Sequence, residues 1–238
     1  MSVNNELKSL YEKYWEQMQI EANSIIDKTN IEIDHPANPF LLKINEEEYD
    51  KADIKVMIFG QETWGWNTTF GKTIENMMNH YENAKENYLS GENKGFRMGF
   101  NFFKDEIEKQ YNNKNIIFIW NNISKIGRYE SKGVTGDIKK LARNFFPVIC
   151  EEIKILNPDI VIFLTGNRDD DIKFHFQDAV FEKYHNNSTL LSKGGTRNYQ
   201  PAYKVISKDL PCKTVKVYHP SYFGGFNNIK HDAIEVLI

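Results

Sequence analysis

The chain has 238 residues, 40% of them apolar and 26% charged, and its formal net charge at pH 7 is −3. This length and composition fit one globular domain with a sizeable core. The charge excludes a general attraction to nucleic acid, and no apolar run is long enough to cross a bilayer. No signal-peptide pattern opens the chain, and its two cysteines, Cys150 and Cys212, form no CxxC or CxxH pattern. We therefore expect a cytoplasmic protein without a membrane segment, metal or other cofactor, and with both cysteines reduced and buried.

The expected elements alternate between helices and short apolar strands. An apolar stripe at helical spacing from Leu7 to Ile26 predicts an N-terminal helix packed on the domain, and Pro36 and Pro39 interrupt the chain after it. Asp137 is the expected cap of a later helix. Strands are expected at 56–59, 116–119, 160–163 and 215–218, and helices at 72–89, 99–110, 137–146, 147–156 and 229–237. This order predicts an α/β fold, a three-layer α/β/α sandwich with a mainly parallel four-stranded central sheet.

We expect residues 1–238 to form a single domain and the protein to be a monomer. Residues 1–50 would be an N-terminal helical extension, and residues 167–213 a long loop inserted between the last two strands. An insertion of this length is either a functional loop or a tolerated surface excursion, and both interpretations stay open.

Four short patches follow the four expected strands in a fixed order. They are Gly60 to Trp64 (GQETW), Trp120 to Asn122 (WNN), Leu164 to Asn167 (LTGN) and His219 to Phe223 (HPSYF). The carboxyl ends of parallel strands line one edge of a sheet, where ligand sites form. A carboxylate, an amide, a small polar turn and a histidine are therefore expected to converge on one crevice.

This series of patches, between Lys55 and Phe226, resembles the uracil-DNA glycosylase superfamily. The corresponding motifs of that family read GQDPYH, LLLN, WG-Ser and HPSPLS. The resemblance implies an enzyme that flips a pyrimidine out of DNA and hydrolyses its N-glycosidic bond. Some relatives hold an iron–sulfur cluster with four cysteines, which this chain cannot supply.

By the resemblance, three residues carry the chemistry. Glu62 would orient water and offset positive charge on the sugar, His219 would donate to the departing base, and Asn121 would read the base edge. Each has a structural alternative: Glu62 as a carboxylate at a helix start, Asn121 as a turn residue at a strand end, and His219 as a structural histidine.

The base pocket departs from the family pattern. Glu62 is one methylene longer than the Asp of most relatives, and Trp64 and Gly65 replace Tyr and His. The excised base is therefore either uracil or a modified pyrimidine such as a 5-substituted cytosine, in base-excision repair or in anti-phage defence. The residues expected to line the base pocket are Gln61, Trp64, Trp66 and Phe70.

Two stretches of the chain are rich in basic residues, which either track DNA phosphates or are ordinary solvated side chains. The first holds Lys125, Arg128, Lys132, Lys139, Lys140 and Arg143, and the second Lys193, Arg197, Lys204, Lys208, Lys213 and Lys216. The residues expected to contact DNA are Thr165, Gly166, Lys193, Arg197, Ser221, Tyr222 and Phe223. Two other functions stay open: a catalytically weak nucleic-acid-binding protein of the same fold, and a small-nucleotide hydrolase.

Overall fold

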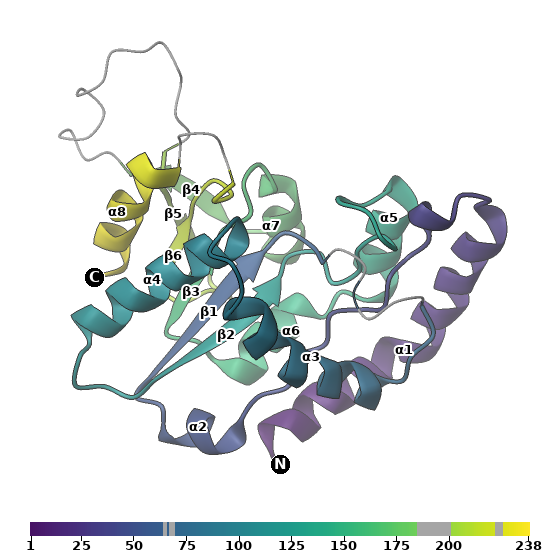
Figure 1. Cartoon of the computed structure of the whole chain (residues 1–238), viewed down its shortest axis with the longest axis horizontal. Helices are drawn as coiled ribbons and strands as arrows, with labels where there is room; N and C mark the ends of the chain where they lie inside the picture. The colour runs from purple at the N-terminus through teal and green to yellow at the C-terminus, as the bar shows by residue number, and fades with distance from the viewer. Residues whose placement is uncertain (64–65, 67–69, 185–200, 222–225) are drawn as a thin grey trace, which may run out of the picture. The chain divides into compact units, whose positions relative to one another are not determined.

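The computed structural model describes residues 1–63, 66, 70–184, 201–221 and 226–238 (Figure 1). The chain folds into two compact units, each assembled from three segments. Unit 1 consists of Met1–Asp50, Gln61–Asn87 and Asn121–Asn157, and unit 2 of Lys51–Gly60, Tyr88–Trp120 and Pro158–Ile238. The chain crosses between the units repeatedly, so neither unit is one continuous stretch. The expected single domain stays a prediction.

Unit 2 is built around a six-stranded sheet with the order β2-β1-β3-β6-β5-β4. The strands are β1 (Ile54–Gly60), β2 (Ile116–Asn122), β3 (Ile160–Phe163), β4 (Val180–Lys183), β5 (Tyr203–Ile206) and β6 (Lys213–Lys216). The sheet confirms the α/β fold and its mainly parallel character. The expected number of four strands is wrong, because β4 and β5 extend the sheet beyond β6.

The strand directions separate a parallel part of the sheet from an antiparallel edge. β1 pairs with β3 in parallel, Val56 opposite Ile160, and β3 pairs with β6 in parallel, Ile160 opposite Lys213. The arrows of β1 and β2 run the same way in Figure 1, and the backbone N–H of Ile54 donates to the carbonyl of Asn115 at the start of β2. β5 and β4 follow β6 as antiparallel neighbours.

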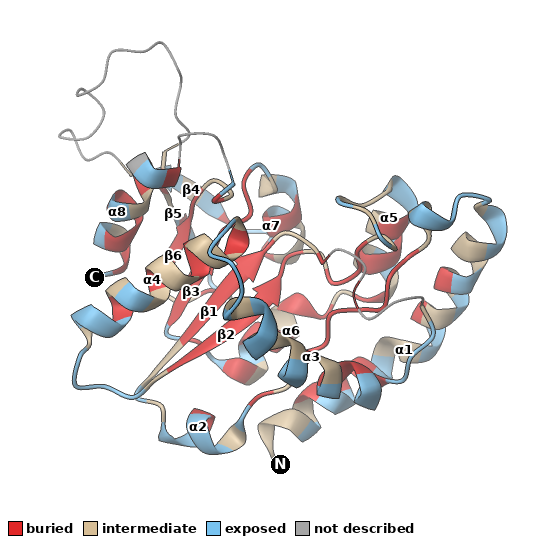
Figure 2. Ribbon diagram, viewed as in Figure 1, coloured by how far each residue is buried: buried red, intermediate tan, exposed pale blue. Residues whose placement is uncertain are grey.

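Strands β1, β2 and β3 form because they contain long runs of apolar, mostly β-branched and aromatic residues, whereas β6 has lysines at both ends and Thr and Val between them. Every residue of β3 is buried, as are the last five of β1 (Figure 2). Such runs are typical of parallel strands that are covered on both faces. β4 instead exposes three of its four residues, as an edge strand does.

The region 167–213 is not the long loop that we expected. It holds helix α7 (Asp169–His175) and strands β4 and β5, which pair as a hairpin, while residues 185–200 lie outside the described part of the chain. Both strands have only four residues, Val-Phe-Glu-Lys in β4 and Tyr-Lys-Val-Ile in β5, and such short mixed segments give a weak periodic signal. Helix α4 (Phe96–Gln110) packs against the closing helix α8 (Phe226–Leu237), and α8 packs against β6.

Unit 1 is mainly helical. The long helix α1 (Val3–Lys28) starts at Ser2, whose side chain accepts from the backbone N–H of Asn5, and packs on α5 (Gly136–Phe145) and α6 (Ile149–Leu156). A short 3-10 helix η1 (Glu32–Asp34), α2 (Glu46–Lys51) and α3 (Ile74–Leu89) complete the helices assigned in this part of the chain. The packed face of α1 includes Leu7, Tyr11 and Met18, as its spacing predicts.

One detail of unit 1 corrects the sequence analysis. The cap of α5 is Thr135 and not Asp137, since the Thr135 hydroxyl accepts from the N–H of Ile138 and Thr135 has an extended backbone. Residues 1–50 hold α1, η1 and all but the last residue of α2, and the expected N-terminal extension stays a prediction. Among the described residues, no helix has the length and apolar character needed to cross a membrane.

Candidate functional site

The segment that follows β1, residues 61–71, is held to unit 1 at both ends. The N–H of Ser124 donates to the carbonyl of Gln61 at 2.9 Å, and a Cβ added at Gly127 would lie 2.1 Å from the carbonyl oxygen of Thr63. At the far end, the side-chain oxygen of Asn38 accepts from the N–H groups of Gly71 and Lys72 at 3.0 and 3.1 Å. Gly127 is therefore required by close approach, and Asn38 fixes the backbone at Gly71 and Lys72.

Glu62 is half-buried, and its carboxylate is oriented by a backbone donor. The N–H of Gly133 donates to Oε1 of Glu62 at 2.9 Å. Gly133 has φ +78°, in the left-handed region that favours glycine, and a Cβ added there would meet no atom within 4 Å. The position of the Glu62 carboxylate thus depends on a backbone conformation that lies 71 residues away in sequence.

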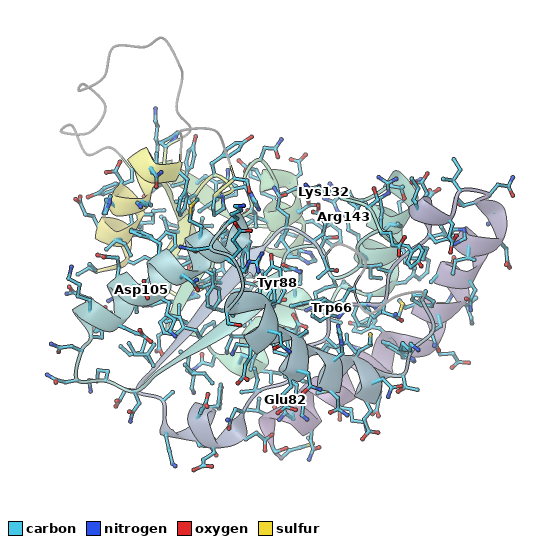
Figure 3. All side chains as sticks on the ribbon, viewed as in Figure 1. Trp66, Glu82, Tyr88, Asp105, Lys132 and Arg143 are labelled. Carbon is cyan, nitrogen blue, oxygen red and sulfur yellow. The ribbon has the colours of Figure 1, made fainter. Side chains whose placement is uncertain are left out.

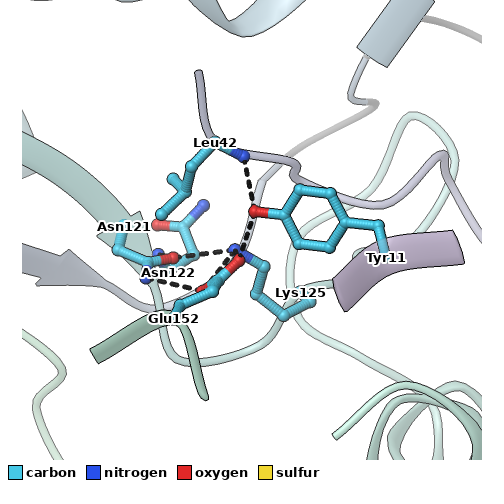
Figure 4. A network of polar contacts seen from close by, with 6 residues as sticks. All are labelled: Tyr11, Leu42, Asn121, Asn122, Lys125 and Glu152. Carbon is cyan, nitrogen blue, oxygen red and sulfur yellow. Dashed lines mark hydrogen bonds and ion pairs between the residues drawn. The ribbon is translucent and has the colours of Figure 1, made fainter. Parts of the chain in front are cut away.

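Asn121 belongs to a buried polar network that Figure 4 shows from close by. Its amide oxygen accepts from Lys125 Nζ at 2.9 Å and from the N–H of Asn122 at 2.8 Å, and its NH₂ donates to Glu152 Oε2 at 2.9 Å. Asn121 has no exposed surface. These contacts fix the orientation of its amide.

A buried ion pair forms the centre of this network. Lys125 Nζ lies 2.8 Å from Glu152 Oε1, and the two side chains are 1% and 0% exposed. Tyr11 donates its hydroxyl to the same Oε1 at 2.7 Å and accepts from the N–H of Leu42 at 3.0 Å. The network therefore joins α1, α6, Leu42 and the end of β2 through one buried ion pair and the hydroxyl, amide and backbone groups that are hydrogen-bonded in it.

Burial shifts the titration of two members of the network. Removal from water lowers the pKa of Lys125, and the negative charge of Glu152 opposes that shift. Burial raises the pKa of Tyr11 well above its usual range, and the neighbouring Glu152 charge raises it further. Tyr11 therefore stays protonated as the hydroxyl donor to Glu152.

The aromatic residues of the 61–71 segment differ in their environments. Trp66 is 7% exposed, and its ring centroid lies 4.7 Å from that of Phe40 and 4.6 Å from that of His80. Burial lowers the pKa of His80. Phe70 is half-buried, and Gln61 is half-buried with its carbonyl bonded to Ser124. Trp66, labelled in Figure 3, is therefore packed between Phe40 and His80, and Trp64 lies outside the described residues.

His219 lies in unit 2, directly after the strand end of β6. Its Nδ1 accepts from the N–H of Ser221 at 3.2 Å. A ring nitrogen that accepts carries no proton, so the proton of the neutral ring is on Nε2. The segment packs on the first turn of α4, since Cβ atoms added at Gly95 and Gly99 would lie 3.0 Å from Ser221 Oγ and 2.4 Å from the Pro220 ring.

The residues expected to contact phosphate are in different environments. Thr165 is fully buried, and Gly166 is buried with φ +65°, so the burial of Thr165 counts against a direct phosphate contact through its hydroxyl. Ser221 is exposed. Lys193, Arg197, Tyr222 and Phe223 lie outside the described residues.

Glu62, Gln61, Asn121, Trp66 and Phe70 therefore belong to unit 1, and His219, Ser221, Thr165 and Gly166 to unit 2. The convergence of Glu62, Asn121 and His219 on one crevice stays a prediction. The sequence analysis missed Gly133, Asn38 and the Lys125–Glu152 pair, because residues far apart in sequence give no local signal of their contact.

The cysteines correct one further expectation. Cys150 and Cys212 are not joined in a disulfide, but Cys150 is half-buried and Cys212 is exposed, so the expected burial of both is wrong. Within the described ranges, no group of three or more His, Cys, Asp or Glu side chains is arranged to hold a metal ion.

Comparison with protein-family models, with curated proteins and with solved structures finds no match for this chain.

Proposed function

We propose that this protein is a DNA glycosylase that flips a pyrimidine out of DNA and hydrolyses its N-glycosidic bond. The observation that carries the proposal is the strand order β2-β1-β3-β6. From β1 the chain passes to β2, which lies on one side of the β1–β3 pair. From β3 it passes through β4 and β5 to β6, which lies on the other side of that pair. The carboxyl ends of β1 and β3 therefore flank a switch point, where open α/β sheets bind ligands. Glu62 follows β1 by two residues, and His219 follows β6 by three.

In this proposal, Glu62 and His219 stabilise the two opposite charges that develop as the glycosidic bond breaks. Bond cleavage builds positive charge on the sugar and negative charge on the base. Glu62, oriented by the Gly133 N–H, offsets the sugar charge and positions the water. His219, with its proton on Nε2, donates to the oxygen of the departing base as a neutral imidazole. Such a donor in a water-poor site contributes about 3 kcal/mol to lowering the barrier.

Asn121 has a different role in this proposal from the one that the sequence predicts. Its amide oxygen already accepts from Lys125 and from the Asn122 N–H, and its NH₂ donates to Glu152. We therefore assign Asn121 as a positioning residue that fixes the end of β2. Reading of the base would pass to Phe70 as the stacking candidate and to Trp64, outside the described residues, as the residue that controls access at the 5-carbon.

The remaining parts of the proposal concern the partner and the setting. A three-layer arrangement would place helices on both faces of the sheet. Ser221 contacts a DNA phosphate, and the substrate base is uracil or a 5-substituted pyrimidine. The activity would serve base-excision repair or anti-phage defence in the cytoplasm.

The test is incubation of the protein with duplex and single-stranded DNAs that each carry one candidate base. Mass spectrometry identifies any released base, and alkaline cleavage of the product strand detects the abasic site. The proposal expects release of one pyrimidine class from DNA. Hydrolysis of free nucleosides without DNA would instead support a small-nucleotide hydrolase, and DNA binding without release would support a catalytically weak binding protein.

A further inference from the structure

We infer that a basic face of unit 1, made of Lys132 and the α5 residues Lys139, Lys140 and Arg143, binds the phosphate backbone of the DNA strand that passes Glu62. This inference rests on the proposed function and adds a contact surface to it. The face lies outside the four strand-end patches.

The structure divides the first basic stretch into internal and surface residues. Lys125 is buried in its ion pair with Glu152. Arg128 braces the turn before α5: it forms an ion pair with Asp34 and donates to the carbonyls of Ile33 at 3.3 Å and Lys132 at 3.2 Å. The other four basic residues of the stretch are exposed or half-buried. The surface charge is therefore gathered on Lys132 and α5.

The buried side of α5 dictates where these charges lie. Ile138, Leu141 and Ala142 are buried, and α1 packs on this helix. The basic residues of α5 occupy its remaining surface at spacings of three and four residues, and Figure 3 shows Lys132 and Arg143 among the side chains around α5. From residue 132 to residue 145 the chain has four basic side chains and one acidic one, Asp137, which gives four minus one, or +3. Asp137 itself lies 3.7 Å from Lys140.

One residue of the basic face, Lys132, is next in sequence to the residue that holds the Glu62 carboxylate. Lys132 immediately precedes Gly133, whose N–H holds Glu62. The turn that carries both residues is fixed by Arg128 and by backbone bridges of Arg128 with Pro36 and with Ser131. A strand whose phosphates contact Lys132 would therefore pass next to Glu62. The overall net charge of −3 gives no general attraction to a polyanion, so DNA binding needs a local group of basic side chains such as this one.

The salt dependence of DNA affinity distinguishes phosphate contacts on this face from binding elsewhere on the protein. Each phosphate contact contributes about 0.7 to 0.9 to the slope of log affinity against log salt concentration. The triple variant Lys132→Gln/Lys139→Gln/Lys140→Gln should therefore lower that slope by about 2 and weaken binding at least about tenfold at 100 mM KCl. Asp137→Asn removes the acidic side chain and should tighten binding.

The experiment measures fluorescence anisotropy of fluorescein-labelled single-stranded and duplex DNA over a series of KCl concentrations. The matched control is Lys8→Gln/Lys13→Gln/Lys28→Gln, which removes three exposed lysines from α1 in the same unit. Far-UV circular dichroism checks that every variant is folded. The control should keep the wild-type slope. Equal slopes for the two triple variants, no tightening by Asp137→Asn, or no DNA binding by the wild-type protein would each overturn the inference. Salt-dependent binding through this face without base release by the wild-type protein would overturn the glycosylase proposal alone.

Discussion

Removal of one partner of the Lys125–Glu152 pair should destabilise the protein far more than removal of both. Lys125→Met leaves the buried Glu152 charge with only the Tyr11 hydroxyl and the Asn121 NH₂ among the donors of Figure 4. Because both side chains are at most 1% exposed, each single variant, Lys125→Met or Glu152→Gln, should lower the free energy of unfolding by about 3–5 kcal/mol. The double variant removes both charges, so its loss should fall short of the sum by at least about 2 kcal/mol.

The helix that carries Glu152 offers a matched control. Lys154 Nζ lies 2.7 Å from Glu151 Oε1, but these side chains are 53% and 46% exposed. Lys154→Met, Glu151→Gln and their double variant should therefore show a coupling below about 1 kcal/mol. Urea unfolding followed by circular dichroism gives each free energy from the midpoint and slope. A Lys125–Glu152 coupling no larger than that of the control pair would refute the buried network.

Three further predictions concern single residues. Tyr11 has a raised pKa in the folded state, so its contribution to stability is present below pH 10 or so and is lost as the pH rises above that value. Urea unfolding of wild type and Tyr11→Phe should give a stability difference that shrinks above about pH 10, and a constant difference would contradict this. His80 has a lowered pKa, so stability should fall as the pH falls below about 6.5, and His80→Phe should flatten that fall in thermal melts; an equal acid response of both proteins would argue against a half-buried, neutral His80. Gly133→Ala strains a backbone with φ +78° by about 1–2 kcal/mol and should slow base release, whereas the neighbouring Gly136→Ala should leave both stability and release near wild type or slightly stabilise the helix. Equal effects of the two alanines on unfolding and on release would remove Gly133 from its positioning role.

Most of the parallel core was predictable because β1, β2 and β3 contain long apolar runs. The fourth parallel strand was expected at 215–218 but is Lys213–Lys216, with a lysine at each end. Residues 160–163 were expected as a strand and form β3 with the same bounds, and the first residue of β2 was also expected. The hairpin of β4 and β5 was not predictable in this way, since β4 exposes most of its residues and has no buried alternation. Helix α7 begins with three aspartates and has only seven residues, which gives no apolar stripe.

The candidate site was predictable only where a motif is local in sequence. Glu62 and His219 could be singled out because each closely follows a strand. The contact of Glu62 with the Gly133 N–H depends on a positive φ at a distant glycine, which no pattern around Glu62 indicates. The use of Asn121 in a buried network was hidden for the same reason: Lys125 reads as a solvated lysine until Glu152, 27 residues later, is seen to be its partner.

The most direct test of the proposed function is the rate of base release from DNA by wild type, Glu62→Gln and His219→Ala, measured by mass spectrometry of the free base in single-turnover conditions. The account predicts that each variant remains folded and releases the base at least about a hundredfold more slowly than wild type, the scale expected for a positioned carboxylate and an oxyanion donor. Wild-type rates in both variants, or no base released from any DNA by the wild-type protein, would contradict it.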